Sequence, residues 1–219
     1  MEIKTVPANS GNYTKGRKES INFIVLHYTA NDGDTAKGNC NYFSSSGRNA
    51  SAHYFVDEND VYQSVLDGDT AWSVGASSYV HNLCRNSNSI SVEMCSKKDL
   101  GGNFYIKENT VSNAVELVKE LMKKHCVPIA NVLRHYDVTG KKCPEPFVRD
   151  SSKWVEFKRR LKEEKMDKTV VKIKVNGAAK TIDGFNVEGT NYVSIRDLCD
   201  MLGVEVGYDN GEKTVVLNK

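Results

Sequence analysis

Residues 21–27 read Ile-Asn-Phe-Ile-Val-Leu-His, an almost continuous apolar run that ends on a histidine. A short apolar run rich in β-branched residues predicts a strand buried on both faces. His27, as the last residue of this strand, is the first candidate for chemistry.

The sequence predicts further helices and strands before and after His135, the second histidine that is a candidate for chemistry. Apolar spacing predicts helices from residue 35, over 110–125 and from 152 onward, and short strands over 52–56, 61–66, 89–94 and near 132–133. In the strand over 89–94, Glu93 lies on the face opposite Ile90, Val92 and Met94, because side chains alternate along a strand. Strands that alternate with helices predict the α/β class.

A charged segment, RRLKEEKMDK over residues 159–168, separates this region from the remainder. We therefore expect a first domain over 1–162, a linker over 163–168 and a small C-terminal domain over 169–219. In the latter, a strand over 170–175, a capped helix after Ser194 and a strand over 213–217 predict a β-α-β unit.

Composition excludes several classes of partner. The 219 residues carry 30 Lys and Arg against 28 Asp and Glu, a net charge of +2, and no block of like charges. This balance disfavours nucleic acid as a partner. We also expect no membrane insertion and no secretory signal, because no apolar run is long enough. Six scattered cysteines indicate reduced thiols, and Cys40, Cys95 and Cys126 are expected in the core.

Three residues form a candidate metal site: His27, His135 and Cys143, which lies eight residues after His135. Two imidazoles and one thiolate are a three-ligand zinc set that leaves the fourth position open, as in catalytic zinc sites. Spacing alone is weak evidence, since isolated histidines are more often structural.

The motifs around these residues resemble a known family. VLHYTA (25–30), SAHYFVD (51–57), SVE (91–93) and the segment 135–144, which ends in Cys143-Pro144, are similar to the zinc-dependent N-acetylmuramoyl-L-alanine amidases of type 2, a family that includes phage endolysins and peptidoglycan-recognition proteins. The resemblance covers residues 1–162. It implies a mixed central β-sheet flanked by helices, with one zinc ion in a groove that holds the substrate.

The resemblance also implies roles for individual residues. His27, His135 and Cys143 would be the zinc ligands, Glu93 the carboxylate beside the attacking water, and Lys141 a catalytic lysine. Some members carry a catalytic tyrosine where this chain has His53, so either His53 or its neighbour Tyr54 is a candidate to face the zinc. Tyr28 and Trp72 are further candidates to line the substrate site, with a core position as the alternative for Trp72.

The C-terminal unit resembles, more weakly, a small repeat found at the N-terminus of copper amine oxidases. Its matching segments are 175–177, 191–198, 202–203 and 206–216, and the absence of histidine there excludes a copper site. Attached to an amidase, such a unit would bind the cell wall and raise the local substrate concentration. The alternative is a stabilising unit or one through which the protein self-associates.

These observations predict a bacteriolytic amidase, a phage or prophage endolysin or an autolysin, whose partner is bacterial peptidoglycan. We expect synthesis in the bacterial cytoplasm and action on the wall after release. The alternative is a non-catalytic recognition protein of the same fold, but such proteins lack the zinc cysteine, and Cys143 is present. An enzyme that recycles soluble wall fragments would not need the C-terminal unit.

Overall fold

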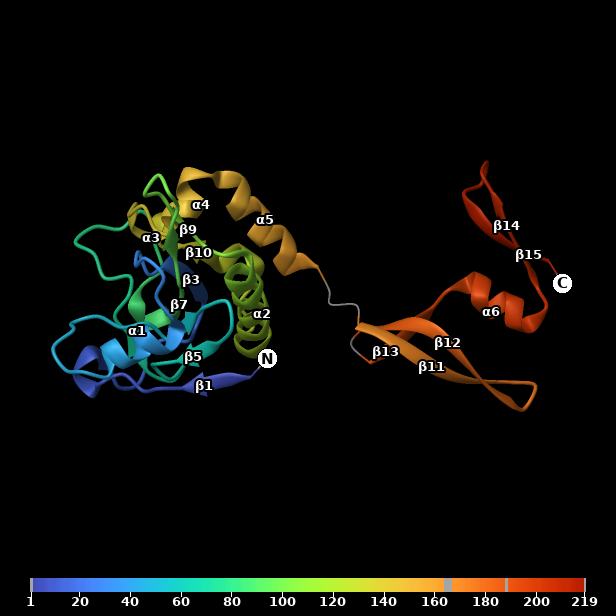
Figure 1. The fold of residues 1–219 in the computed structure, drawn as a ribbon, viewed down its shortest axis with the longest axis horizontal. Helices are drawn as coiled ribbons and strands as arrows, with labels where there is room; N and C mark the ends of the chain where they lie inside the picture. The colour runs from blue at the N-terminus through green and yellow to red at the C-terminus, as the bar shows by residue number, and fades with distance from the viewer. Residues whose placement is uncertain (1, 164–166, 188, 219) are drawn as a thin grey trace. The chain divides into compact units, whose positions relative to one another are not determined.

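The computed structural model describes residues 2–163, 167–187 and 189–218, and the chain divides into two compact units, 1–162 and 163–219. Each is described by itself (Figure 1). Helix α5 ends at Lys162, and strand β11 begins at Asp167. Residues 164–166 of the predicted linker lie outside the described residues.

A six-stranded mixed sheet forms the centre of the first unit (Figure 1). Its strand order is β1-β5-β4-β7-β3-β10, and every neighbouring pair is parallel except β4 and β5. The strands are β1 (Ile3–Thr5), β3 (Phe23–Tyr28), β4 (Tyr54–Val56), β5 (Val61–Gln63), β7 (Ser89–Met94) and β10 (Val132–Arg134). The predicted mixed α/β sheet is confirmed, as are the strands over 21–27 and 89–94.

The two faces of β3 pack against different layers. Ile24 and Leu26 join the main hydrophobic cluster with helices α2 (Glu108–His125), α4 (Glu145–Arg149) and α5 (Ser151–Lys162). Phe23 and Val25 point to the opposite face, where Val138 of helix α3 (His135–Thr139) covers them. Since side chains alternate, His27 belongs to this second face.

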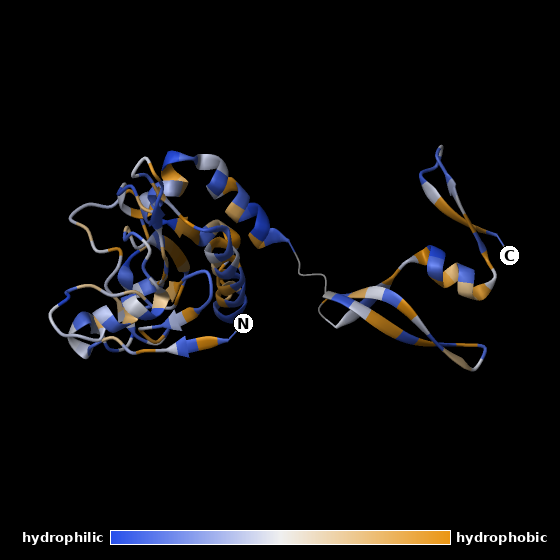
Figure 2. Ribbon diagram, in the orientation of Figure 1, coloured by the Kyte–Doolittle hydropathy of each residue, from blue (hydrophilic) through white to orange (hydrophobic). Residues whose placement is uncertain are grey.

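Helix α2 packs against the sheet through the apolar positions that its sequence pattern predicts. Its apolar positions recur at helical spacing, and Ala114, Leu117, Val118 and Leu121 are buried against the sheet. Figure 2 shows hydrophobic residues on one side of α2 and hydrophilic residues on the other. Cys126 ends the helix in the left-handed conformation and is exposed, so the prediction that it belongs to the core was wrong.

On the second face, helix α1 (Ala36–Phe43) packs over β4 and β5 through a separate cluster that includes Cys40, Phe55 and Cys95. Both of these cysteines are buried, as predicted. Thr35 caps the helix by accepting a hydrogen bond from the Gly38 amide. The remaining short elements of this unit are η1 (Ser10–Asn12), β2 (Tyr13–Thr14), β6 (Thr70–Ala71), η2 (Asn86–Asn88), β8 (Lys97–Lys98), β9 (Phe104–Tyr105) and η3 (Ile129–Asn131).

The second unit is richer in strands than predicted. A three-stranded antiparallel sheet of β11 (Asp167–Val175), β12 (Ala178–Val187) and β13 (Thr190–Val193) precedes helix α6 (Ile195–Leu202), and a hairpin of β14 (Glu205–Asp209) and β15 (Thr214–Asn218) follows it. The predicted strand, helix and strand correspond to β11, α6 and β15. Ser194 caps α6, and Gly203 ends it in the left-handed conformation.

Among the described residues, none of the helices combines the length and the apolar character that a membrane crossing requires.

Candidate metal centre and substrate groove

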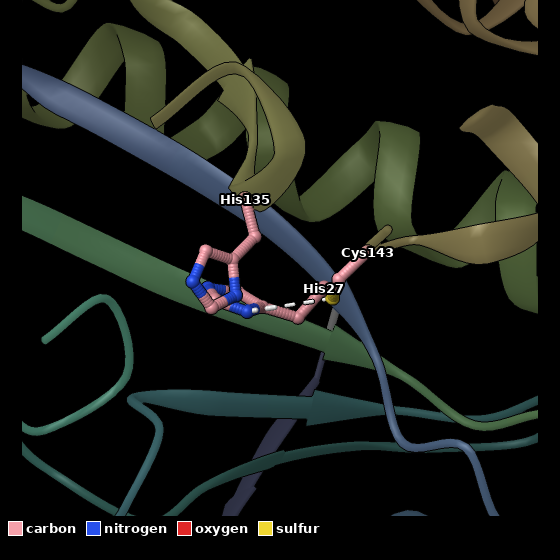
Figure 3. Close-up of side chains that lie close together, drawn as sticks. All are labelled: His27, His135 and Cys143. Carbon is pink, nitrogen blue, oxygen red and sulfur yellow. Dashed lines mark hydrogen bonds between the residues drawn. The ribbon is translucent and has the colours of Figure 1, made fainter. Parts of the chain in front are cut away.

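Three segments bring His27, His135 and Cys143 together (Figure 3). His27 lies near the end of β3, and His135 is the first residue of α3, directly after β10. Since β3 and β10 are parallel neighbours, Leu26 pairs with Arg134, and both histidines follow at the same edge of the sheet. A hydrogen bond from the Tyr136 amide of α3 to the Cys143 carbonyl holds the returning chain at this edge.

The ligand atoms of the three side chains all lie within 4.8 Å of one another. Cys143 Sγ is 3.8 Å from His27 Nδ1, and the two imidazole rings are 4.7 Å apart between centroids. Ligands bound at 2.0–2.3 Å from one zinc ion would be roughly 3.3–3.8 Å apart. The spacing of the three side chains therefore suits a single ion.

The electrostatics of the cluster also suit a metal. His27 Nε2 and His135 Nδ1 are buried nitrogens without a hydrogen-bond partner in the structure. Burial, with Lys141 nearby, lowers the pKa of His135 to about 4, and burial together with His135 lowers the pKa of His27 well below its usual range. Both imidazoles are thus neutral at pH 7, the form that binds metal.

Cys143 is held as a buried thiol. Burial and the nearby carboxyl of Glu93 raise its pKa to about 12, while a hydrogen bond from the Tyr28 backbone and the charge of Lys141 act in the opposite direction. A thiol in such a place loses its proton when it coordinates a cation. The donor set, two neutral imidazoles and one thiol, is that of an open zinc site.

Glu93 lies beside the cluster on the neighbouring strand. Its Oε1 is 3.9 Å from His27 Nδ1, and its Oε2 is buried without a partner in the structure. Burial raises the pKa of Glu93 to about 8, although Lys141 opposes this shift. A cation bound next to it would favour the carboxylate. Glu93 is therefore placed to exchange a proton with a molecule at the metal centre.

Lys141 supplies the positive charge of the site. The residue is exposed, and its charge acts on His27, Glu93, His135 and Cys143 alike. It precedes Cys143 by two residues, and the turn is closed by a hydrogen bond from the Cys143 amide to the Lys141 carbonyl.

Two hollows adjoin the cluster. One, of about 640 Å³, is lined by His135, Lys141 and Trp72 together with residues 49–50, 73 and 75–78. The other, of about 530 Å³, is lined by Glu93, residues of α1 and residues of the segment 29–34. Volumes of this size are typical of ligand sites. Space for a ligand thus adjoins both the metal cluster, at His135, and the carboxyl of Glu93.

The remaining predicted site residues occupy different surroundings. Trp72 lines the first hollow and donates from its ring nitrogen to Thr14. Tyr28 is partly buried and packs edge-on against Phe104. Tyr54 points into the main core, where its hydroxyl donates to Asp67, and is not among the residues that line either hollow.

His53 is fully buried between the sheet and Arg17. Its Nδ1 lies 3.0 Å from the Ser91 amide, and its Nε2 lies 2.6 Å from Arg17 Nη2. Burial and the Arg17 charge lower the pKa of His53 to about 3. A proton on His53 would in turn lower the pKa of His27 further. His53 is thus a buried neutral imidazole held by Arg17 and Ser91.

Sequence reasoning missed two supporting arginines. Arg17 donates to the carbonyls of Asp67 and Ser89 and contacts His53. It lies in a polar, basic segment, and no feature of the sequence there distinguishes it from an exposed surface arginine. Arg134 binds the Asp137 carboxylate and donates to the Phe147 carbonyl, which ties α3 to the helix that follows Cys143. The acidic residue in the first turn after Arg134 was the available signal.

Comparison with known proteins gives one consistent result. The family model described as N-acetylmuramoyl-L-alanine amidase matches residues 17–146. The amidase CwlL of Bacillus licheniformis is 39% identical over 158 residues, covering 68% of this chain and 43% of the relative. The amidase BlyA of Bacillus subtilis strain 168 is 36% identical over 186 residues, covering 76% and 48%. The chain thus spans less than half the length of these relatives.

Solved structures agree with the sequence relatives. PlyL superposes with a TM-score of 0.63 at 28% identity, covering 74% of this chain and 98% of PlyL. The catalytic domain of XlyA gives a TM-score of 0.62 at 27% identity, covering 74% and 99%. The match accounts for the fold of the first unit.

Proposed function

Since the chain belongs to the N-acetylmuramoyl-L-alanine amidase family, we propose that it hydrolyses the amide bond between N-acetylmuramic acid and L-alanine in peptidoglycan with one zinc ion held by His27, His135 and Cys143. The observation that carries this proposal is that these three buried side chains converge beside Glu93, whose buried Oε2 has no hydrogen-bond partner in the structure. The substrate places the action of the protein at the bacterial cell wall.

Zinc bound at this centre would supply Lewis acidity, which polarises a carbonyl oxygen and makes water more acidic. Glu93 takes a proton from the attacking water as its oxygen bonds to the lactyl carbonyl carbon. Glu93 then gives that proton to the nitrogen of L-alanine as the carbon–nitrogen bond breaks. The products are the free lactyl carboxylate and a free amino terminus.

Lys141 stabilises the negative charge that develops on the carbonyl oxygen. Its ammonium group is the cation whose field reaches all the other residues of the centre. Charge placed where the transition state becomes negative lowers the barrier more than it strengthens ground-state binding. Trp72, at the wall of the hollow that holds Lys141, offers a face on which a sugar ring can pack.

The second unit would bind the wall. Its residues 168–170, 183–185, 192–194 and 197 line a hollow of about 610 Å³ that presents the rings of Phe185 and Tyr192 together with the carboxylates of Asp183 and Asp197. Aromatic faces flanked by hydrogen-bonding groups suit a sugar or peptide of the wall. Such a unit raises the effective substrate concentration of the attached catalytic unit.

Digestion of purified Gram-positive walls tests the activity. We expect new amino-terminal alanine without new reducing sugar ends, loss of the reaction on chelation and its return with zinc. Binding to walls without any new ends would instead assign the fold to recognition.

Substitution of a ligand tests the metal centre separately. Cys143→Ala removes one of three ligands, so bound zinc should fall well below one ion per chain while the circular dichroism stays that of a folded protein. Cys126→Ala, which removes an exposed thiol from the end of α2, should bind zinc as the parent does. Full zinc content in Cys143→Ala would exclude this ligand set.

A further inference from the structure

The hollow beside Glu93 has a distinctive charge. It lies between α1 and the segment 29–34, and its charged lining residues are Asp34 and Glu93, both acidic. The other lining side chains are neutral, namely Thr29, Asn31, Asn39, Tyr42, Phe43 and Phe55. Among the described residues, neither lysine nor arginine contributes to this lining. The carboxylate of Asp34 gives this half-enclosed cavity a negative charge, which attracts a cation.

Asp34 is held in place by neutral groups. Its Oδ2 accepts from the side-chain amides of Asn39 at 2.6 Å and Asn31 at 3.3 Å, and its Oδ1 accepts from the Ser96 backbone amide at 3.2 Å. These donors fix the orientation of the carboxylate without neutralising its charge. The structure gives Asp34 no ionic partner among the described residues, so its charge remains available to a cation in the hollow.

The hollow lined by His135 and Lys141 has the opposite character. It presents Lys141 and Trp72, and its described lining contains neither aspartate nor glutamate. An indole face and a neutral-to-positive wall suit N-acetylated sugars, which carry no positive charge. The hollow that adjoins His135 and the hollow that adjoins Glu93 thus differ in charge.

We propose that the hollow beside Glu93 receives the stem peptide and that Asp34 binds the ammonium group of its diamino acid. This inference rests on the proposed amidase function, which fixes Glu93 at the bond that joins glycan to peptide. The side-chain amine of lysine, ornithine or diaminopimelate is the cation that an N-acetylated muropeptide carries at neutral pH.

An ion pair between Asp34 and this ammonium group would make recognition depend on whether the stem peptide is cross-linked. Cross-linking turns this amine into an amide and removes its charge. A half-buried ion pair with an oriented carboxylate is stronger than a fully exposed one. The protein would therefore favour stems that are not cross-linked through this amine over stems that are.

A pair of soluble substrates isolates the contact. N-acetylmuramoyl-L-alanyl-γ-D-glutamyl-L-lysine and the same compound with an Nε-acetyl group on the lysine differ in this charge. We expect wild-type kcat/KM to be about five- to tenfold higher for the free amine. Asp34→Asn, which keeps the size of the side chain, should lower kcat/KM for the free amine to that of the acetylated substrate and leave the acetylated one nearly unchanged.

The same loop offers a matched control. Asp32 is exposed, accepts from the Lys98 amide and is not part of the lining of the hollow. Asp32→Asn removes an identical charge two residues away, so it should preserve the preference. Loss of the preference for the free amine in both variants would show that it arises from long-range electrostatics. It would contradict a direct contact between Asp34 and the ammonium group.

Two further results would overturn the inference. One is equal hydrolysis of the two substrates by the wild type, and the other is an equal loss on both substrates in Asp34→Asn, which would indicate a structural role. Calorimetric binding of the free tripeptide and its Nε-acetyl form separates this inference from the proposed function. Tighter binding of the free amine without hydrolysis of either substrate would contradict the amidase activity and keep the assignment of Asp34.

Discussion

His27 and Glu93 are direct partners in the register of two parallel strands, β3 and β7, and their side chains emerge on the same face with Nδ1 and Oε1 3.9 Å apart. Val25 pairs with Ser91 and points to this face as well, whereas Leu26 and Val92 pair on the opposite face and enter the main core. A shift of register by one residue would move Glu93 to that core face. The sheet therefore fixes the placement of the proposed base relative to the metal.

The first prediction concerns that base. Glu93→Gln keeps the shape of the side chain but cannot accept a proton, so kcat on soluble muropeptides should fall by about 10²–10⁴. Zinc content should stay near one ion per chain, because Glu93 is not one of the three ligands. Glu156→Gln, on the exposed side of α5, is the matched control and should keep the parent rate. An unchanged kcat in Glu93→Gln would exclude the proposed role.

Adjacent lysines allow a sharp test of the positive charge. Lys141→Met should lower kcat by about 10²-fold, because one group that stabilises the developing oxyanion is lost. Lys142→Met removes the same charge one residue further along and should change kcat little. Steady-state kinetics on a soluble muropeptide give both values. Equal effects of the two substitutions would indicate a general electrostatic contribution rather than a specific one.

The lowered pKa of buried His53 should make the stability of the protein depend on pH. Its pKa is about 3 in the folded protein against an ordinary value of 6.5, so between these two values the unfolded chain binds a proton that the folded protein does not. The free energy of unfolding therefore rises with pH across this window. The contribution of His53 is complete above about pH 6.5 and decreases as the pH falls below that value, by about 1.4 kcal/mol per pH unit.

Denaturant unfolding between pH 4 and 7 checks this expectation. His27 and His135 contribute in the same direction in the metal-free protein, so the comparison needs His53→Gln measured beside the parent in chelator. The substitution should reduce the slope by about one proton. An identical slope in both proteins would show that His53 does not titrate as the burial and Arg17 contact require.

Truncation separates the roles of the two units. Residues 1–162 contain their own hydrophobic clusters, and we expect this fragment to hydrolyse soluble muropeptides within about twofold of the full chain. Its co-sedimentation with purified walls should fall by about tenfold or more, because the tethering unit is lost. Equal sedimentation of both forms would remove the wall-binding role from the second unit and favour the alternative of self-association.

Local pattern predicted five of the six strands of the central sheet, all but β1, and the helices α1, α2 and α5, but not the short helices α3 and α4. The strand at 89–94 and the helix ending at His125 follow from alternation and from 3.6-residue spacing, which depend on neighbours in the chain alone. In the second unit the same approach found β11, α6 and β15 but missed β12, β13 and β14. Strands β13 and β14 are short, and β12 carries polar residues at exposed positions, so the local pattern is weak. Pairing with neighbouring strands is what makes these segments strands.

The sequence by itself determined the chemistry available to this protein: two histidines and a cysteine in family motifs, a glutamate on the outward face of a strand, and a lysine two residues before the cysteine. Only the tertiary structure decided that Tyr54 turns into the core, that Arg17 lies against His53, and that Asp34 and Glu93 share one hollow while Lys141 and Trp72 share another. Periodicity reports which face a side chain occupies, because that depends on local backbone geometry. Which distant segments cover that face depends on strand order and loop packing, and these arise only when the whole chain folds.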